Sequence, residues 1–205
     1  MNRYFFYIRY LPEVVNCEFL AGKCIRILHA FQSRFELRSI GVAFPEWSAS
    51  SIGTSIAFVS ESERSLAMLR TQHYFTRMVE EGYFALSDIL LVPIELGVPE
   101  VIYYRERRLE KETAAAKKRE FKRLQNRAIS RGVEYKPKES QSKESVLPLS
   151  HLIPFCSSSG RVFNLCIGRL DCNQLINDQF SSYGLGNRVN MTGSVPGLAP
   201  FIKTL

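Results

Sequence analysis

The 205-residue chain has no apolar run of the roughly 18 residues that a membrane-spanning helix requires. Its N-terminal segment, MNRYFFYIRYLPE, is aromatic and interrupted by Arg9. It lacks the continuous apolar core and small-residue cleavage site of a signal peptide. We therefore expect a cytoplasmic protein without a membrane partner.

The sequence also lacks the patterns of a disulfide framework or a zinc site. Its five cysteines are odd in number, none forms a CxxC pair, and its three histidines are scattered. Buried free thiols in a reducing compartment explain these cysteines best. A GxSxG nucleophile elbow and a Walker loop are absent as well. We predict no metal site and no cofactor.

What the chain has in excess is positive charge, concentrated in one stretch. Residues 105–131 carry eleven Lys or Arg against four Glu, which equals the net charge of +7 of the whole chain. No Pro or Gly interrupts the stretch, so we predict a helix over about residues 109–131.

On this helix, at 100° per residue, one side is weakly apolar and the other cationic. We expect the apolar side to dock on the body; it holds Ala114, Phe121, Leu124 and Ala128. Arg side chains offer planar forks that match phosphate oxygens, so the cationic side predicts a polyanion partner, most simply nucleic acid. A merely solvated charged helix is the alternative, but such helices usually mix signs.

The first half of the chain alternates strand and helix patterns. Strands are predicted at 3–10, 40–44, 52–59 and 89–94, and helices at 18–35 and 60–81. Ser60 with Glu63 forms a capping-box signature at the start of the second helix, and Gly82 marks its end. The order βαββαβ predicts a ferredoxin-like domain over residues 1–97.

The second half, residues 98–205, predicts a further α/β module built around the basic helix. The polar, Lys- and Ser-rich residues 132–148 predict a flexible linker. Strand patterns stand at 101–104, 151–155, 162–167 and 179–183. The fold class is therefore α+β.

Four positions are candidates for chemistry or binding. His29 lies opposite the apolar stripe of its helix, which suits a proton acceptor near neutral pH but equally an ordinary surface histidine. The loop 156–161 is rich in Ser and Gly and either approaches a phosphate or forms a plain hairpin turn. Phe163 either stacks a base or lies in the core. Tyr183 either donates to a phosphate or closes a strand.

Nearly the whole chain resembles the CRISPR repeat-processing endoribonucleases of the type I-F branch. The resemblance rests on the helix CIRILH at 24–29, the strand IGVAFP at 40–45, the basic helix, the strand at 160–167 and the YGL at 183–185. Leu11-Pro12-Glu13 and the segment FSSYG at 180–184 are most similar to members carried by transposons.

The resemblance implies metal-independent cleavage of a CRISPR repeat hairpin at the 3′ base of its stem. The ribose 2′-OH attacks, the product ends in a 2′,3′-cyclic phosphate, and the protein stays bound as the terminal subunit of the guide complex. Implied partners are the backbone subunits of that complex and a transposition-recruitment protein, with target DNA reached only indirectly.

The resemblance also assigns roles to residues. It places the catalytic base on His29 and an active-site tyrosine on Tyr183. Because the loop is shorter here, the place of the catalytic serine falls on Cys156, Ser157 or Ser158, of which Ser157 is preferred. The implied RNA-binding residues are Arg105, Arg107, Arg108, Lys118, Arg119, Lys122, Arg123, Arg127 and the base-stacking Phe163.

Two other functions stay open from the sequence. One is a structural subunit that binds an RNA hairpin without cutting it. The other, ranked lowest, is a DNA-binding or ribosome-associated module that uses the same basic helix.

Overall fold

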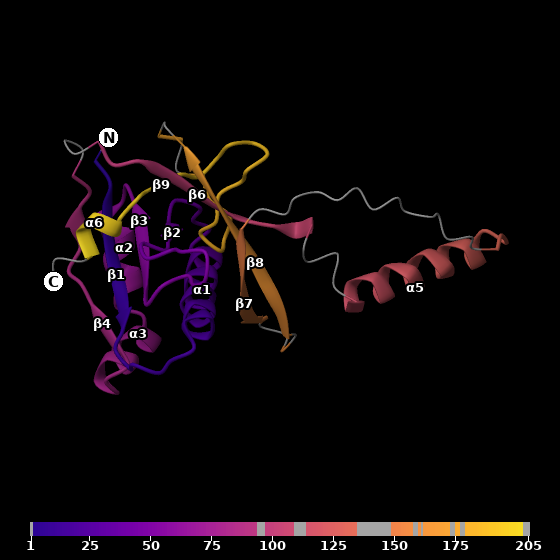
Figure 1. Cartoon of the computed structure of the whole chain (residues 1–205), viewed down its shortest axis with the longest axis horizontal. Coiled ribbons are helices and arrows are strands. Elements are labelled where there is room, and N and C mark those ends of the chain that lie inside the picture. Colours follow the sequence, from indigo (N-terminus) through magenta and orange to yellow (C-terminus); the bar gives the residue numbers. More distant parts are fainter. Residues whose placement is uncertain are drawn as a thin grey trace.

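The computed structural model describes residues 2–93, 97–108, 114–134, 149–157, 160, 162–172, 175–176 and 179–202. Within them, two antiparallel sheets and several helices form an α+β fold, as predicted (Figure 1). None of the described helices is long and apolar enough to cross a bilayer.

The N-terminal half folds around strand β1. The elements in chain order are β1 (Tyr4–Tyr10), α1 (Cys17–Arg34), β2 (Gly41–Ala43), β3 (Ser55–Ser60), α2 (Glu63–Arg70), α3 (His73–Glu80), β4 (Phe84–Leu86) and β5 (Leu90–Leu91). The sheet order is β2-β3-β1-β4, and β5 pairs with the other end of β1. This order is that of a split βαβ arrangement, with its fourth strand divided into β4 and β5.

Three predictions in this half were wrong in detail. The helix predicted over 60–81 is two helices, because Gln72 adopts extended backbone angles (φ −61°, ψ 133°) between them. The N-cap of α2 is Ser62, whose side chain accepts from the Ser65 amide, whereas Ser60 ends strand β3. The fourth strand begins near Phe84 rather than at residue 89.

The C-terminal half forms the second sheet, in the order β7-β8-β6-β9. Its elements are β6 (Glu100–Arg105), β7 (Ser150–Cys156), β8 (Val162–Cys172), β9 (Val195–Pro196) and the short helix α6 (Ala199–Ile202). The strand predicted at 179–183 was wrong. Its backbone pairs outside any sheet, with the Phe180 amide donating to the Arg38 carbonyl and the Gly184 amide to the Ser181 carbonyl.

The two sheets contribute to one apolar core, in which helix α1 packs against β7. Gly22 allows this approach, because a Cβ there would lie 2.2 Å from the Pro154 carbonyl oxygen. A buried ion pair between Arg3 and Glu100 joins the start of the first sheet to β6. The division into domains at residue 97 remains a prediction.

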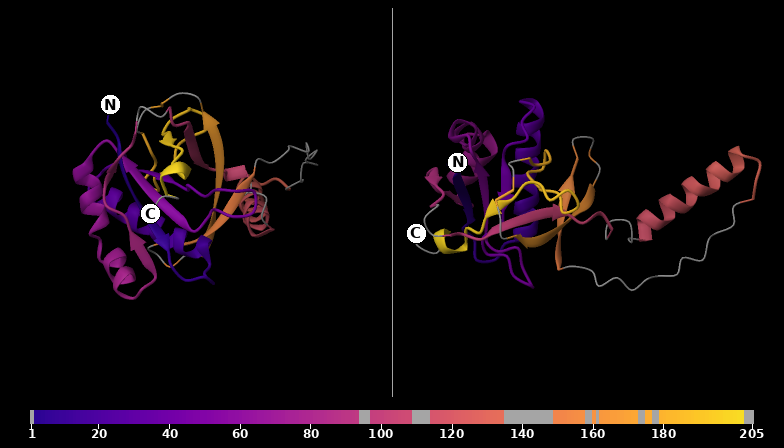
Figure 2. Two further views of the ribbon diagram at one scale, coloured as in Figure 1. Left: turned by 60° about the vertical axis from the view of Figure 1, so that its left-hand side comes forward. Right: turned by 90° about the horizontal axis from the view of Figure 1, so that it is seen from above.

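The basic helix α5 (Ala114–Ser130) lies apart from this body (Figures 1 and 2). The predicted docking of its apolar side was wrong for this structure, since Phe121 is 48% exposed. The physical reason is the small area of this side, since two of its four residues are alanine and it offers little apolar surface to bury. Residues 109–113 and most of the predicted linker, 135–148, lie outside the described residues.

Candidate RNA-binding and catalytic site

The centre of the site is a chain of aromatic rings contributed by four separate segments. The ring of His29, in α1, stacks on that of Tyr183 with centroids 4.4 Å apart and planes 5° apart. Tyr183 contacts Phe155 of β7 edge-on at 5.4 Å, and Phe155 contacts Phe163 of β8 at 5.2 Å. The guanidinium of Arg105 lies 5.7 Å from the Phe163 ring centroid. Thus His29, Tyr183, Phe163 and Arg105, chosen from the sequence, are linked in one array.

The local backbone explains why Tyr183 reaches α1. Gly184, which follows it, has a φ of +72°, and a Cβ there would lie 2.6 Å from Leu28 Cδ2. Only glycine fits this close, left-handed position without strain. The Gly184 carbonyl accepts from the Val42 amide, which fastens the loop to β2.

His29 is placed so that its neutral form is favoured. Burial against the loop lowers the pKa of its imidazole below the ordinary 6.5, the nearby Arg38 charge lowers it further, and the Ser182 carbonyl raises it in part. Its Nδ1 is buried, and no described residue forms a hydrogen bond of good geometry with it. The nitrogen left to exchange a proton with a ligand is therefore Nε2.

A groove of about 850 Å³ opens beside Tyr183. One wall is the end of β6 and the residues after it, including Arg105, Arg107 and Arg108, and the other is the loop 179–192. Arg107 and Arg108 are exposed and Arg105 is half-buried. The three predicted arginines thus line the same groove as Tyr183, on which the His29 ring stacks.

Ser157 follows the last residue of β7, and its carbonyl accepts from the Gly160 amide across the hairpin turn. Cys156 still pairs with Val162 in the sheet. Ser158 lies outside the described residues. The choice of Ser157 for the serine role therefore stays a prediction.

The described cationic residues of α5 are all exposed: Lys117, Lys118, Arg119, Lys122, Arg123 and Arg127. Glu120 is the one acidic residue of α5, and it forms an ion pair of 3.6 Å with Arg123. The helix therefore presents a strongly positive surface to solvent, in keeping with its predicted use.

Sequence reasoning missed three groove residues, namely Tyr104, Glu106 and Arg188. Tyr104 was assigned only to a strand, and Arg188 lies in a Gly- and Pro-rich tail for which no binding role was predicted. The bridge between Tyr104 and Gly186, which crosses from β6 to that tail, and the contacts of Arg188 with Tyr104 and Glu106 bring them together. Among the described residues, no three His, Cys, Asp or Glu side chains gather closely enough to hold a metal ion.

The α+β fold, the cationic groove and the basic helix are typical of a protein that binds nucleic acid. The family described as CRISPR-associated protein (Cas_Csy4) matches residues 5–197 of the chain. The chain therefore belongs to this family of type I-F CRISPR repeat-processing proteins. It matches no curated protein at a significant level.

Membership assigns a CRISPR-associated RNA-processing function, in a family of endoribonucleases. It also supports CRISPR RNA as the ligand and a guide complex as the setting.

Proposed function

We propose that the protein is a metal-independent endoribonuclease that cuts a CRISPR repeat hairpin at the 3′ base of its stem and keeps the product. The observation that carries this proposal is the stack of His29 on Tyr183, which lines the same groove as Arg105, Arg107 and Arg108. A hairpin held by the groove and by α5 would bring the foot of its stem to that imidazole.

The chemistry asks little of the protein besides alignment, proton transfer and charge stabilisation. The neutral His29 accepts the proton of the ribose 2′-OH at Nε2. The 2′-oxygen then forms a bond to phosphorus while the bond from phosphorus to the 5′-oxygen breaks. That oxygen leaves as a 5′-OH after taking a proton from water, and the other product ends in a 2′,3′-cyclic phosphate.

The remaining candidates have supporting tasks. Tyr183 holds the imidazole plane and offers a hydroxyl to the reacting phosphate, and Ser157 orients the 2′-OH. Arg105 and Arg107 contact bases at the foot of the stem, and Phe163 stacks a base. Arg108 and the cations of α5, including Lys118, hold phosphates; the other α5 residues in this set are Arg119, Lys122, Arg123 and Arg127.

The decisive experiment uses the repeat hairpin in EDTA, with and without a 2′-deoxy nucleotide upstream of the cut. We expect cleavage in EDTA, none with the 2′-deoxy substrate, and a cyclic phosphate detected by mass spectrometry of the 3′ end. The variant His29→Ala should bind normally and cut about 10²–10⁴-fold more slowly, the usual contribution of a general base.

His73→Ala is the matched control, since His73 lies on α3 outside the array and should be dispensable. Tight binding with intact RNA under every condition would instead support the structural-subunit function. Full-rate cutting by His29→Ala would show that another group is the base.

We further propose that the protein remains the terminal subunit of the type I-F guide complex, in contact with its backbone subunits. A transposition-recruitment protein is the partner expected if the chain serves a transposon. Co-purification of the product RNA with the protein after cleavage tests product retention.

A further inference from the structure

A buried carboxylate, that of Glu106, is among the groups that line the cationic groove. Glu106 is 4% exposed, and its backbone amide donates to the Cys166 carbonyl of β8. Its carboxylate accepts from Arg108 Nε and Nη2, each at 3.0 Å, and from the Arg108 backbone amide at 3.1 Å. A negative charge opposes the binding of phosphates, so this position needs an explanation beyond charge.

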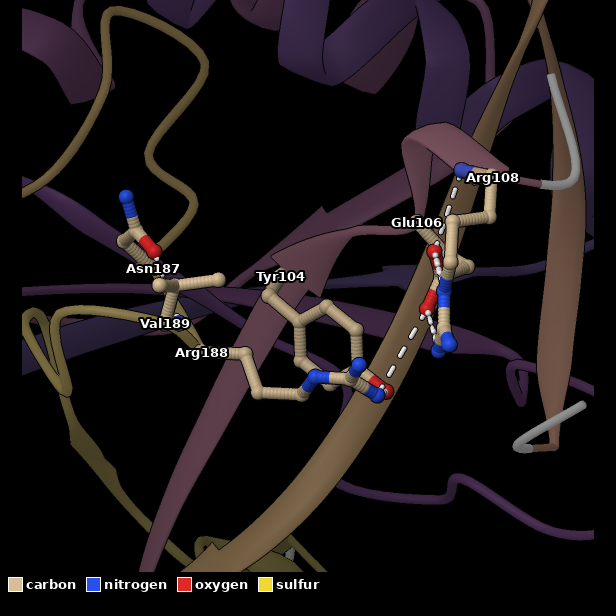
Figure 3. Close-up of polar contacts among 6 residues, drawn as sticks. All are labelled: Tyr104, Glu106, Arg108, Asn187, Arg188 and Val189. Atoms are coloured by element: carbon tan, nitrogen blue, oxygen red, sulfur yellow. Dashed lines mark hydrogen bonds and ion pairs between the residues drawn. The ribbon is translucent and has the colours of Figure 1, made fainter. Parts of the chain in front are cut away.

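The explanation begins with Arg188, which approaches the same carboxylate from the opposite wall. Arg188 Nη1 lies 3.6 Å from Glu106 Oε2 and donates to the Tyr104 hydroxyl at 3.3 Å. Its guanidinium lies 5.1 Å from the Tyr104 ring centroid (Figure 3). Glu106 thus stands between two arginines, one from each wall.

The turn that carries Arg188 is held in place by its own backbone. Asn187 Oδ1 accepts from the Val189 and Asn190 amides, and Asn187 pairs with Thr192 across the turn. The Gly186 amide donates to the Tyr103 carbonyl, which fastens the turn to β6. This anchoring limits the positions that the Arg188 guanidinium can reach.

The position of the Tyr104 ring, on which Arg188 stacks, also has a local cause. Tyr104 lies opposite Gly168 in the β6–β8 register, and a Cβ at Gly168 would lie 2.6 Å from the Tyr104 ring. The ring can therefore lie flat on β8 and support the guanidinium stacked on it. Arg188 still has 35% of its side chain exposed, toward the groove that it lines.

We propose that Arg188 binds a backbone phosphate at the foot of the RNA stem, from the wall opposite Arg105 and Arg107, and that Glu106 positions Arg188 and Arg108 for this contact. The proposal rests on the proposed function, since it concerns the same hairpin. Glu106 fixes the two guanidiniums before RNA arrives, so less side-chain freedom is lost on binding. The foot of the stem is then held from both sides beside His29.

The first test compares Arg188→Ala with Arg169→Ala for binding of the cleaved hairpin, which lacks RNA beyond the cut. Arg169 is a matched control: it is 34% exposed and pairs with Asp171. It lies opposite Tyr103, so it belongs to the other face of the sheet from Tyr104. We expect Arg188→Ala to bind about tenfold more weakly, with the salt-dependence slope reduced by roughly one, and Arg169→Ala to change little.

The second test uses Glu106→Gln, for which two explanations predict opposite signs. If Glu106 only opposes phosphates, removing its charge tightens hairpin binding. If it positions the arginines, hairpin binding weakens several-fold, and the preference for the hairpin over an unstructured RNA of equal length falls. Thermal unfolding of each variant reports its fold, and Arg188→Gln, which removes the charge but keeps a long side chain, replaces Arg188→Ala if that variant unfolds.

The proposal is overturned if Arg188 variants bind like Arg169→Ala, if their defect appears only with RNA that extends past the cut, or if Glu106→Gln binds the hairpin more tightly. These outcomes leave the proposed function standing when the wild type still cuts and His29→Ala does not. Failure of the wild type to bind or cut the hairpin would instead reject the function itself.

Discussion

At the scale of single residues, the site is governed by one half-buried histidine. Stacking on Tyr183 removes water from the His29 ring, and the Arg38 charge adds to this effect, so the pKa is lowered. A base must be neutral before it acts, and a lowered pKa keeps it neutral over more of the pH range. Burial therefore prepares His29 for proton transfer near neutral pH.

The pH dependence of cleavage follows from this shift. The rate of the free enzyme on dilute hairpin should be constant at high pH and fall as pH decreases through a value below 6.5, where His29 becomes protonated. RNA phosphates favour the protonated form, so the midpoint for the bound complex should lie higher. Rates at subsaturating and saturating protein measure the two profiles, and a free-enzyme midpoint well above 6.5 would contradict the assigned environment.

Tyr183→Ala provides the control for this prediction. Without the stacked ring, His29 gains water and its pKa should rise toward 6.5, as measured by an NMR titration of the imidazole protons. An unchanged midpoint would show that the stack does not set the pKa.

Site residues could be predicted from the sequence where a residue departed from the pattern of its own element. His29 was noticed because it lies off the apolar stripe of a regular helix, and the arginines because their charge is concentrated. Arg188 and Glu106 broke no pattern. Their roles depend on a contact between β6 and the tail, which no local rule predicts.

At the scale of elements, helix α1 sets the position of the base. Gly22 and His29 are seven residues apart and so share one side of the helix, and Gly22 faces β7. The spacing between α1 and β7, which carries Phe155, therefore also fixes His29 relative to the aromatic array.

Gly22→Ala should disturb both the fold and the site. Its added Cβ would lie 2.2 Å from the Pro154 carbonyl oxygen, so α1 or β7 must shift. We expect a loss of about 1–3 kcal/mol in the free energy of unfolding, typical of overpacking, and slower cleavage. Urea denaturation and single-turnover assays measure these effects. Ser33→Ala, at an exposed position of the same helix, is the control, and equal stability of both variants would refute the close packing.

Element prediction succeeded where one regular pattern runs unbroken along the whole element, as in β1 and α1, although both faces of β1 are buried. It failed where an apolar spacing continues in the sequence although the helix backbone is interrupted. The apolar spacing of 60–81 runs through Gln72, although the chain turns there. Residues 179–183 have strand-forming side chains, but their backbone pairs with Arg38 and Leu185 instead of a sheet.

At the scale of the whole molecule, the body and the basic helix differ in how they are held. The two sheets share one core, and the Arg3–Glu100 ion pair joins them. Helix α5 stands apart, with its cationic residues exposed. The sequence predicted the helix and its charge but wrongly predicted docking, because periodicity shows which side is apolar and not whether its area suffices.

The separation of α5 predicts a specific response to RNA. A helix of 17 residues is near the length at which an isolated helix becomes marginal in water, and closely spaced cations on it repel one another. Its backbone amides should therefore exchange hydrogen much faster than those of the buried strand β3. Bound phosphates neutralise the repulsion, so the hairpin should slow exchange across Ala114–Ser130 and leave β3 unchanged. Hydrogen-exchange mass spectrometry with and without RNA measures this difference, and high salt should abolish it. Equal exchange of α5 in the free and bound protein would mean that the hairpin is held by the groove alone.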